Sequence, residues 1–144
     1  MLTQEIFKAN DIRGLAGGAD AQWDADGAYA LGVAFVDTLD LAHKEKAFAL
    51  GRDMRVTGPE LSDAFARGAM SRGVDVVDIG LASTDQLWFA SGRLELPGVQ
   101  FTASHNPATY NGIKFCLAEA RPVTPAQLIE IARRAFDFEA RNTN

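Results

Sequence analysis

The sequence is poor in cysteine, in basic residues and in long apolar runs, and each shortage excludes a class of protein. Its single cysteine, Cys116, leaves no partner for an internal disulfide and excludes a metal site built on several thiolates. No apolar run comes near the ~20 residues that a membrane-spanning helix needs. With 14 Lys and Arg against 19 Asp and Glu, the net charge of −5 argues against a general binder of nucleic acid or of anionic membranes.

These shortages also set expectations for location and partners. The first residues lack the basic and long apolar segments of a secretory signal, and one cysteine agrees with a reducing compartment. We therefore expect a cytoplasmic protein with neither a membrane nor a nucleic acid as partner. Because the overall balance is acidic, an anionic substrate would have to be held by a local cluster of cations.

The order of the expected elements predicts the fold class. The 144 residues, 47% of them apolar, fit one domain with a hydrophobic core, so we expect a single domain over 1–144. Segments of helical periodicity alternate with short apolar segments, which predicts an α/β domain with a layered mixed sheet of about four strands flanked by helices. The expected strands are 47–50, 74–79, 98–102 and 112–117, after an extended segment at 2–15.

Each expected helix begins at a recognisable capping residue. Asp24 or Asp26 can cap the first helix, and Thr84 can cap the third. Two further starts follow the capping-box pattern, in which a Glu or Gln lies three residues after the cap: Thr57 with Glu60, and Thr124 with Gln127.

The link between the last two strands concentrates the reactive side chains. It contains no helical pattern, so we expect those strands to pair antiparallel across a long loop. Ser104 follows an apolar strand, and a phosphate on a serine has three strong acceptor oxygens that need positioned donors. Taken alone, Ser-His-Asn-Pro is also a common turn, and that reading stays open from local sequence. The possible donors within ten residues are His105, Asn106, Asn111 and Lys114.

Two arginines elsewhere are further candidates for binding phosphate. Arg13, at the end of the first extended segment, can donate two parallel hydrogen bonds to a phosphate, or it is a surface residue before the turn at Gly14. Arg52 follows the strand at 47–50, where a glycine-containing loop opens a helix and can present N–H groups to an anion. The alternative is that Arg52 pairs with Asp53 and fixes that loop.

Together these segments resemble the α-D-phosphohexomutases, the phosphomannomutase/phosphoglucomutase family. The resemblance rests on Phe-Lys-Ala-Asn-Asp-Ile-Arg-Gly at 7–14, Gly-Arg-Asp-Met-Arg at 51–55 and, above all, the stretch 102–114. It covers essentially the whole chain, but only the first of the family's four domains. Two positions depart from the family pattern: Asn10 stands where many members have a tyrosine, and Asp85 where a proline is common.

The resemblance implies a role for each candidate residue. Ser104 would be the phosphoserine that interconverts hexose 1-phosphate and hexose 6-phosphate through a hexose 1,6-bisphosphate. Mg²⁺ would bind one oxygen of that serine phosphate. His105 and Lys114 match positions that place the substrate and move protons, and Arg13 matches a position near the phosphoserine. The predicted phosphate-binding residues are Arg13, Arg52, Asn106, Asn111 and Lys114.

Three loops of the family are not found in this sequence: an Asp-x-Asp-x-Asp metal loop, a Gly-Glu-x-Ser-Gly sugar loop and an Arg-x-Ser-Gly-Thr phosphate clamp. We therefore expect the partners to be a hexose phosphate, of mannose or glucose, and the remaining domains of the same enzyme. Since catalysis needs all these parts together, we expect the isolated domain to be nearly inactive. The alternatives are a phosphoglucosamine mutase domain, a non-catalytic phosphate-binding module, and a structural fragment whose Trp88 and Phe89 form an interface.

Overall fold

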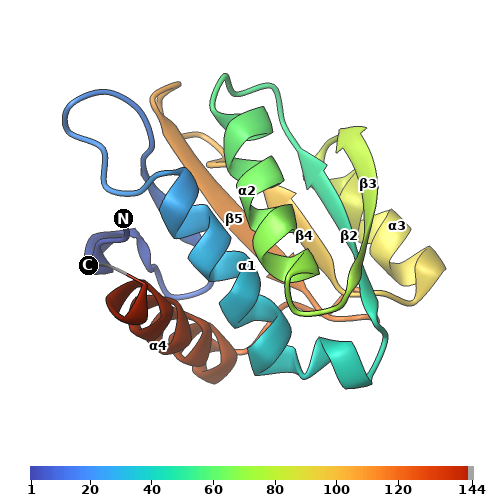
Figure 1. Cartoon of the computed structure of the whole chain (residues 1–144). Helices are drawn as coiled ribbons and strands as arrows, with labels where there is room; N and C mark the ends of the chain where they lie inside the picture. The colour runs from blue at the N-terminus through green and yellow to red at the C-terminus, as the bar shows by residue number, and fades with distance from the viewer. Residues whose placement is uncertain (143–144) are drawn as a thin grey trace.

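A five-stranded mixed sheet with helices on both faces forms the computed structural model, which describes residues 1–142 (Figure 1). This confirms the predicted α/β class, with one strand more than the four expected. The strands are β1 (Ile12–Leu15), β2 (Ala47–Arg52), β3 (Asp75–Leu81), β4 (Gly98–Phe101) and β5 (Tyr110–Cys116). The helices are α1 (Ala25–Leu39), α2 (Gly58–Met70), α3 (Thr84–Leu94) and α4 (Pro125–Arg141), with short 3-10 turns at Gln4–Ile6 and Leu41–His43.

The strand order is β1-β5-β4-β2-β3, and the direction of each strand follows from what connects it to the next. The strands β2, β3 and β4 run parallel, because α2 and α3 return the chain to the same end of the sheet. The link from β4 to β5 has no helix, and the two strands pair antiparallel as predicted. The extra strand, β1, comes from the extended segment near the N-terminus and pairs antiparallel with β5.

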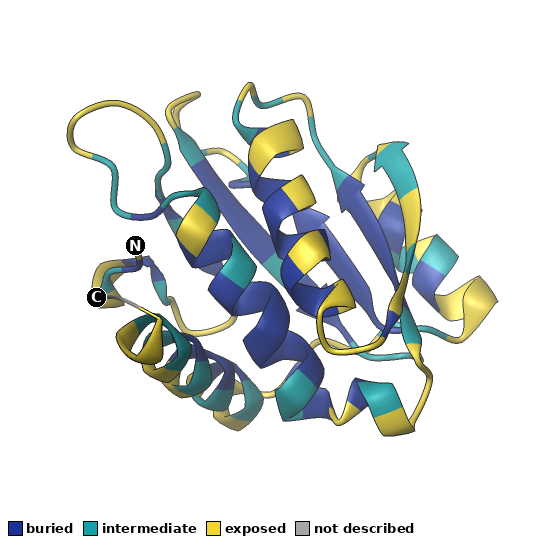
Figure 2. Cartoon of the chain, in the orientation of Figure 1, coloured by how far each residue is buried: buried dark blue, intermediate teal, exposed yellow. Residues whose placement is uncertain are grey.

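The main core lies between the sheet and the layer formed by α1, α2 and α4. Its centre is a cluster of five phenylalanines whose neighbouring ring centroids lie 5.3 to 6.3 Å apart: Phe35, Phe48, Phe65, Phe101 and Phe115. A smaller cluster under α3 covers the opposite face. Figure 2 shows the central strands buried, while exposed residues lie along the edge strand β3, on the outer faces of the helices and in the loops.

The contact between α1 and α2 depends on two glycines. The helices α1 and α2 cross where Gly32 faces the backbone carbonyl of Phe65 and Gly68 faces that of Tyr29. A methyl group at either glycine would collide with that carbonyl oxygen. The helix axes therefore approach closely enough to bury Phe35 and Phe65 against each other.

Two of the four predicted helix caps are confirmed, one lies a residue earlier, and one stands at the predicted position without a side-chain hydrogen bond. Asp24 caps α1 through Gly27 N–H at 3.0 Å, and Thr124 forms the predicted capping box with α4. The cap of α3 is Ser83, one residue before the predicted Thr84. Thr57 is the N-cap residue of α2, but its backbone is already helical and its side chain makes no capping hydrogen bond; its hydroxyl accepts one from the amide of Asn111. Within residues 1–142, no helix combines the length and apolar character needed to cross a bilayer.

Candidate phosphate-transfer site

The loop 102–109 lies at the carboxyl end of β4, beside the loop that follows the parallel strand β2. The carboxyl ends of parallel strands are where open α/β sheets usually bind ligands. The other end of the loop joins the first residues of β5. There the backbone carbonyl of Thr109 accepts a hydrogen bond at 2.9 Å from the N–H of Ala16, the residue after β1. Segments from three parts of the chain therefore surround Ser104.

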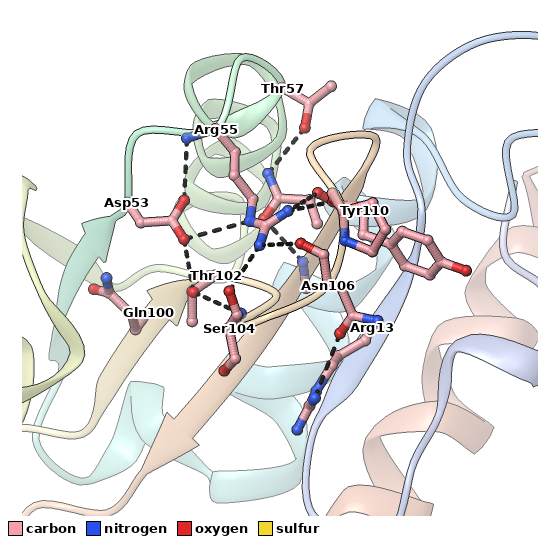
Figure 3. A network of polar contacts seen from close by, with 12 residues as sticks. Arg13, Asp53, Arg55, Thr57, Gln100, Thr102, Ser104, Asn106 and Tyr110 are labelled. Carbon is pink, nitrogen blue, oxygen red and sulfur yellow. Dashed lines mark hydrogen bonds and ion pairs between the residues drawn. The ribbon is translucent and has the colours of Figure 1, made fainter.

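The backbone of Ser104 is fixed, while its hydroxyl is not engaged. Its φ of 54° lies in the left-handed region, which a residue with a Cβ adopts at a cost of about 1–2 kcal/mol. Its N–H donates to Thr102 Oγ1 at 3.1 Å, and its carbonyl accepts from Arg55 Nη2 at 2.9 Å. The half-exposed Ser104 hydroxyl makes no hydrogen bond with any of residues 1–142, so it is available to an external group (Figure 3).

Arg55 binds the Ser104 loop, although no local pattern singled it out. The structure pairs Asp53 with Arg55 rather than with Arg52: the Arg55 N–H donates to Asp53 Oδ1 at 3.1 Å, and Nε lies 3.4 Å from Oδ2. Asp53 Oδ2 also accepts from the Thr102 hydroxyl at 2.7 Å (Figure 3). The alternation of large and small residues along β2 is the signal that separates the two arginines, because it places Arg52 on the same face as Phe48 and Leu50.

Arg52 therefore lies away from the Ser104 loop. Its aliphatic chain passes Gly58, and it lines a surface groove between α2 and β3 together with Pro59 and Val76. The structure does not bring this predicted phosphate-binding residue to the serine.

Arg13 does lie at the loop. Its guanidinium donates to the buried carboxylate of Asp11, through Nε at 3.1 Å and Nη2 at 3.0 Å. Its Nη1 lies 3.4 Å from Asn106 Oδ1, a long hydrogen bond that reaches the Ser104 loop (Figure 3). The side chain is 36% exposed, so Asp11 orients the cation at a position that solvent or a ligand can reach.

Lys114 and His105 have no side-chain hydrogen bond or ion pair among residues 1–142. Lys114 is half-buried and lies opposite Gln100 in the β4–β5 register. The pleat places it on the face of the sheet away from the phenylalanine cluster, the face that Arg13 also shares. His105 is exposed on the loop beside Ser104. Both side chains are free to donate to an external anion.

The two asparagines have different positions. Asn106 is half-buried within the loop, and its Oδ1 is the acceptor for Arg13. Asn111 is fully buried: its Nδ2 donates to Thr57 Oγ1 at 2.9 Å and its Oδ1 accepts from Gly112 N–H at 2.8 Å. Asn111 therefore ties β5 to the start of α2 and presents no free polar atom at the serine.

The described residues do not build a magnesium site by themselves. Residues 1–142 contain no cluster of three or more Asp, Glu, His or Cys side chains arranged to hold a metal ion. Asp53, the carboxylate bonded to this loop network, already binds Thr102 and Arg55. The Ser104 hydroxyl, which makes no hydrogen bond within residues 1–142, is open to an external group.

Comparison with known proteins agrees with this arrangement. The family model "Phosphoglucomutase/phosphomannomutase, alpha/beta/alpha domain I" matches residues 4–142. A phosphomannomutase of Klebsiella pneumoniae is 41% identical over 119 residues, which make up 82% of this chain and 71% of that sequence. A phosphomannomutase of Escherichia coli is 42% identical over 125 residues, 86% of this chain but 26% of the relative.

A solved structure shows the same fold. A phosphoglucomutase/phosphomannomutase family protein from Burkholderia thailandensis superposes with a TM-score of 0.79 at 35% sequence identity. The match covers 96% of this chain and 31% of that one, so this chain spans about a third of that protein and about a quarter of the E. coli relative. The chain belongs to the phosphoglucomutase/phosphomannomutase family, and its residues form the α/β/α domain I of that family.

Proposed function

We propose that this domain carries the phosphoryl donor of a phosphohexomutase, with Ser104 as the phosphoserine. The observation that supports this most strongly is the contrast at Ser104, whose backbone is bonded on both sides while its hydroxyl is unengaged and half-exposed. Arg13, which Asp11 orients, contacts the same loop at Asn106, and Lys114 has no partner among residues 1–142.

The proposed reaction is the exchange of one phosphoryl group between Ser104 and a sugar hydroxyl. The bond from phosphorus to Ser104 Oγ breaks, and Oγ takes up a proton from a general acid as it leaves. A bond from phosphorus to the sugar hydroxyl oxygen forms, and the proton of that hydroxyl passes to a base. The bisphosphorylated sugar then returns its other phosphate to Ser104 by the reverse step. Phosphoryl transfer depends mostly on positioning and on stabilising charge, so the surrounding donors matter more than nucleophilic power.

Each nearby residue has a role that matches its position. Arg13 and Lys114 stabilise the phosphate charge from one face of the sheet, and the amide of Asn106 adds a donor from the loop itself. His105 and Lys114 are the candidates for moving the proton, because neither is bonded within residues 1–142. Asn111 keeps β5 in place, and the proposal gives Arg52 no contact with the phosphate.

The remaining components of the reaction lie beyond this chain. Mg²⁺ would neutralise the phosphate charge. One oxygen of the Ser104 phosphate would bind the ion, together with ligands outside this sequence. The chain corresponds to 26% of the E. coli phosphomannomutase, which supports further domains as partners. The relatives' names favour mannose phosphate, with glucose phosphate as the second substrate. Hexose 1,6-bisphosphate would be the activator. The single, buried cysteine supports a cytoplasmic location.

Intact-mass measurement on the complete natural protein tests the proposal. After incubation with hexose 1,6-bisphosphate, we expect one phosphate per chain, mapped to Ser104 by peptide fragmentation. Ser104→Ala should carry none and lose mutase activity by at least about 10⁴-fold, since it lacks the oxygen that carries the group. Ser71→Ala, at the end of α2, is the matched control and should resemble the wild type.

Three outcomes would argue against it. Unchanged activity in Ser104→Ala would refute the phosphoserine. Reversible binding of inorganic phosphate with no covalent adduct would favour the phosphate-binding module. Residues 1–144 should be nearly inactive alone, and turnover comparable to the complete enzyme would contradict the expectation that other domains are needed.

A further inference from the structure

Arg55 lies at the centre of the polar network beneath the Ser104 loop (Figure 3). Its side chain is 9% exposed and enters from the loop after β2. Each terminal nitrogen donates two hydrogen bonds, and all four acceptors are backbone carbonyls of the loop or its end. Nη1 binds those of Pro107 at 2.6 Å and Tyr110 at 3.0 Å, and Nη2 those of Ser104 and Asn106 at 2.9 Å.

A second connection reaches the other side of the serine. Asp53 accepts from the Arg55 backbone at 3.1 Å and from the Thr102 hydroxyl at 2.7 Å. Thr102 Oγ1 in turn accepts from the Ser104 N–H at 3.1 Å. Both peptide groups next to the Ser104 Cα are thus bonded, directly or through Thr102 and Asp53, to the same arginine.

These bonds explain how the loop keeps an unfavourable conformation. Ser104 has a positive φ, and such residues persist where their surroundings fix them from several sides. The loop carbonyls bonded to Arg55 at residues 104, 106 and 107 have no strand partner, because the β4–β5 ladder pairs residues 98–101 with 113–116. Over this stretch, beyond the β4–β5 ladder, the loop carbonyls accept their hydrogen bonds from the guanidinium of Arg55.

We propose that Arg55, with Asp53 and Thr102, is the positioning device that sets the direction of the Ser104 Oγ–phosphorus bond during phosphoryl transfer. This rests on the proposed function of Ser104 as the phosphoryl carrier. Arg55 does not touch the phosphate, because all four of its terminal N–H groups are already bonded to carbonyls. It acts on the reaction through the backbone of residue 104.

The geometry requires arginine and not simply a cation. Four carbonyls are reached by a planar fork with two N–H groups on each terminal nitrogen, whereas a lysine ammonium has three donors at one point. Arg55→Lys therefore keeps the charge and removes the fork. Arg67→Lys is the matched control, because Arg67 is exposed on α2 and pairs with Asp63 at 3.0 Å far from the loop carbonyls.

The test compares these two variants in the complete natural protein. For Arg55→Lys we expect kcat to fall by about 100-fold with little change in KM, since a misplaced reacting group costs on this scale. We also expect faster amide exchange at Ser104, Asn106 and Tyr110, whose N–H groups bond within the loop region. Arg67→Lys should match the wild type in both measurements.

A second pair of variants covers the case in which Arg55→Lys fails to fold. Thr102→Ser keeps the hydroxyl that links Asp53 to Ser104, and Thr102→Val removes it. We expect the serine variant to retain kcat within about threefold and the valine variant to lose at least about tenfold. Equal activity in these two variants, corrected for folded fraction, would overturn the positioning role.

The failure of this proposal is distinguishable from failure of the proposed function. If the wild type carries phosphate on Ser104 and Arg55→Lys keeps its kcat and amide protection, the positioning role is refuted and the phosphoserine stands. If Ser104 is never phosphorylated, the role in transfer fails together with the phosphoserine, and amide exchange alone decides whether Arg55 holds the loop.

Discussion

Gly112 joins the Ser104 loop to the sheet at a point where three backbones meet. It pairs with Arg13 of β1, and its carbonyl accepts from Thr102 N–H at 3.0 Å. A Cβ at this position would overlap the carbonyl oxygen of Ile12 and lie 2.8 Å from that of Thr102. Since both obstacles are backbone atoms in the sheet, no side-chain rotation can relieve the contact.

Replacement of this glycine should therefore be costly. For Gly112→Ala we expect a loss of at least about 1–3 kcal/mol in the free energy of unfolding, measured by urea denaturation, because β1 and β4 must move apart. Gly92→Ala is the control: its Cβ would lie 3.9 Å from that of Ala120, and alanine favours helix α3 by up to about 1 kcal/mol. A Gly112→Ala chain as stable as the wild type would contradict the crowding.

Arg52 and Arg55 show how far the roles of single residues can be predicted from the sequence. Both belong to the string at 51–55 on which the family resemblance partly rests, but only Arg52 was predicted to bind phosphate. Arg52 is the last residue of β2 and lines the groove beside α2, whereas Arg55, in the following loop, binds the Ser104 loop. The four carbonyls that Arg55 binds lie about fifty residues away, so no local pattern could name them.

At the scale of elements, the capping-box pattern predicted the side-chain contacts at the start of α4 but not those at the start of α2. Thr124 and Gln127 form their capping box at an exposed helix start. Thr57 has the same local pattern and stands at the N-cap of α2, but its backbone is helical and its side chain accepts from the buried amide of Asn111 instead of capping the helix. The local pattern therefore predicted where the helix begins and not the partner of the Thr57 side chain, which lies 54 residues along the chain.

Helix α4 carries an ion-pair cluster whose pH dependence can be predicted. Arg133, three residues after Glu130, donates to it at 2.6 and 2.9 Å and lowers the pKa of this exposed carboxyl to about 2. Arg134, four residues after, adds a bond at 2.7 Å. Because the folded pKa is below the unfolded value of 4.5, the stabilisation is complete above pH 4.5 and is lost as pH falls towards 2.

The corresponding measurement is a carboxyl titration by NMR. We expect a midpoint near 2 for Glu130 in the wild type and a higher one in Arg133→Ala. The stability difference between the two proteins should shrink as pH falls through this range. Arg121→Ala, which removes the partner of Glu119 outside the helix, should leave the Glu130 midpoint unchanged. An identical midpoint in Arg133→Ala would show that the pair does not form in solution.

At the scale of the whole molecule, the alternation of strands and helices was sufficient to predict the fold class and the antiparallel β4–β5 pair. It was not sufficient to predict the fifth strand. The segment Ile12–Leu15 gains its strand character from pairing with β5, about a hundred residues later, and not from its own composition. Contacts of this range depend on the assembled sheet, which is why the edge of the sheet is harder to predict than its centre.

The reactivity of Cys116 reports how cooperatively the sheet and its helices unfold. It ends β5 between β4 and the smaller core under α3, it is fully buried, and its thiol donates to Ser91 Oγ at 3.3 Å. Burial raises the pKa of the thiol, so both access and thiolate formation oppose its reaction. The sheet must open before a reagent reaches this sulfur.

Thiol labelling by a disulfide reagent across a urea series measures that opening. Without urea, we expect Cys116 to react at least about a thousandfold more slowly than an exposed thiol, since unfolding of a domain costs about 5–15 kcal/mol. The exposed reference is Val56→Cys combined with Cys116→Ala, because Val56 is 93% exposed. The labelling rate should rise with urea in step with the loss of far-UV circular dichroism if residues 1–142 unfold as one unit. Rapid labelling without urea would instead show that the end of β5 opens locally, and with it the strand that supports Lys114 and Gly112.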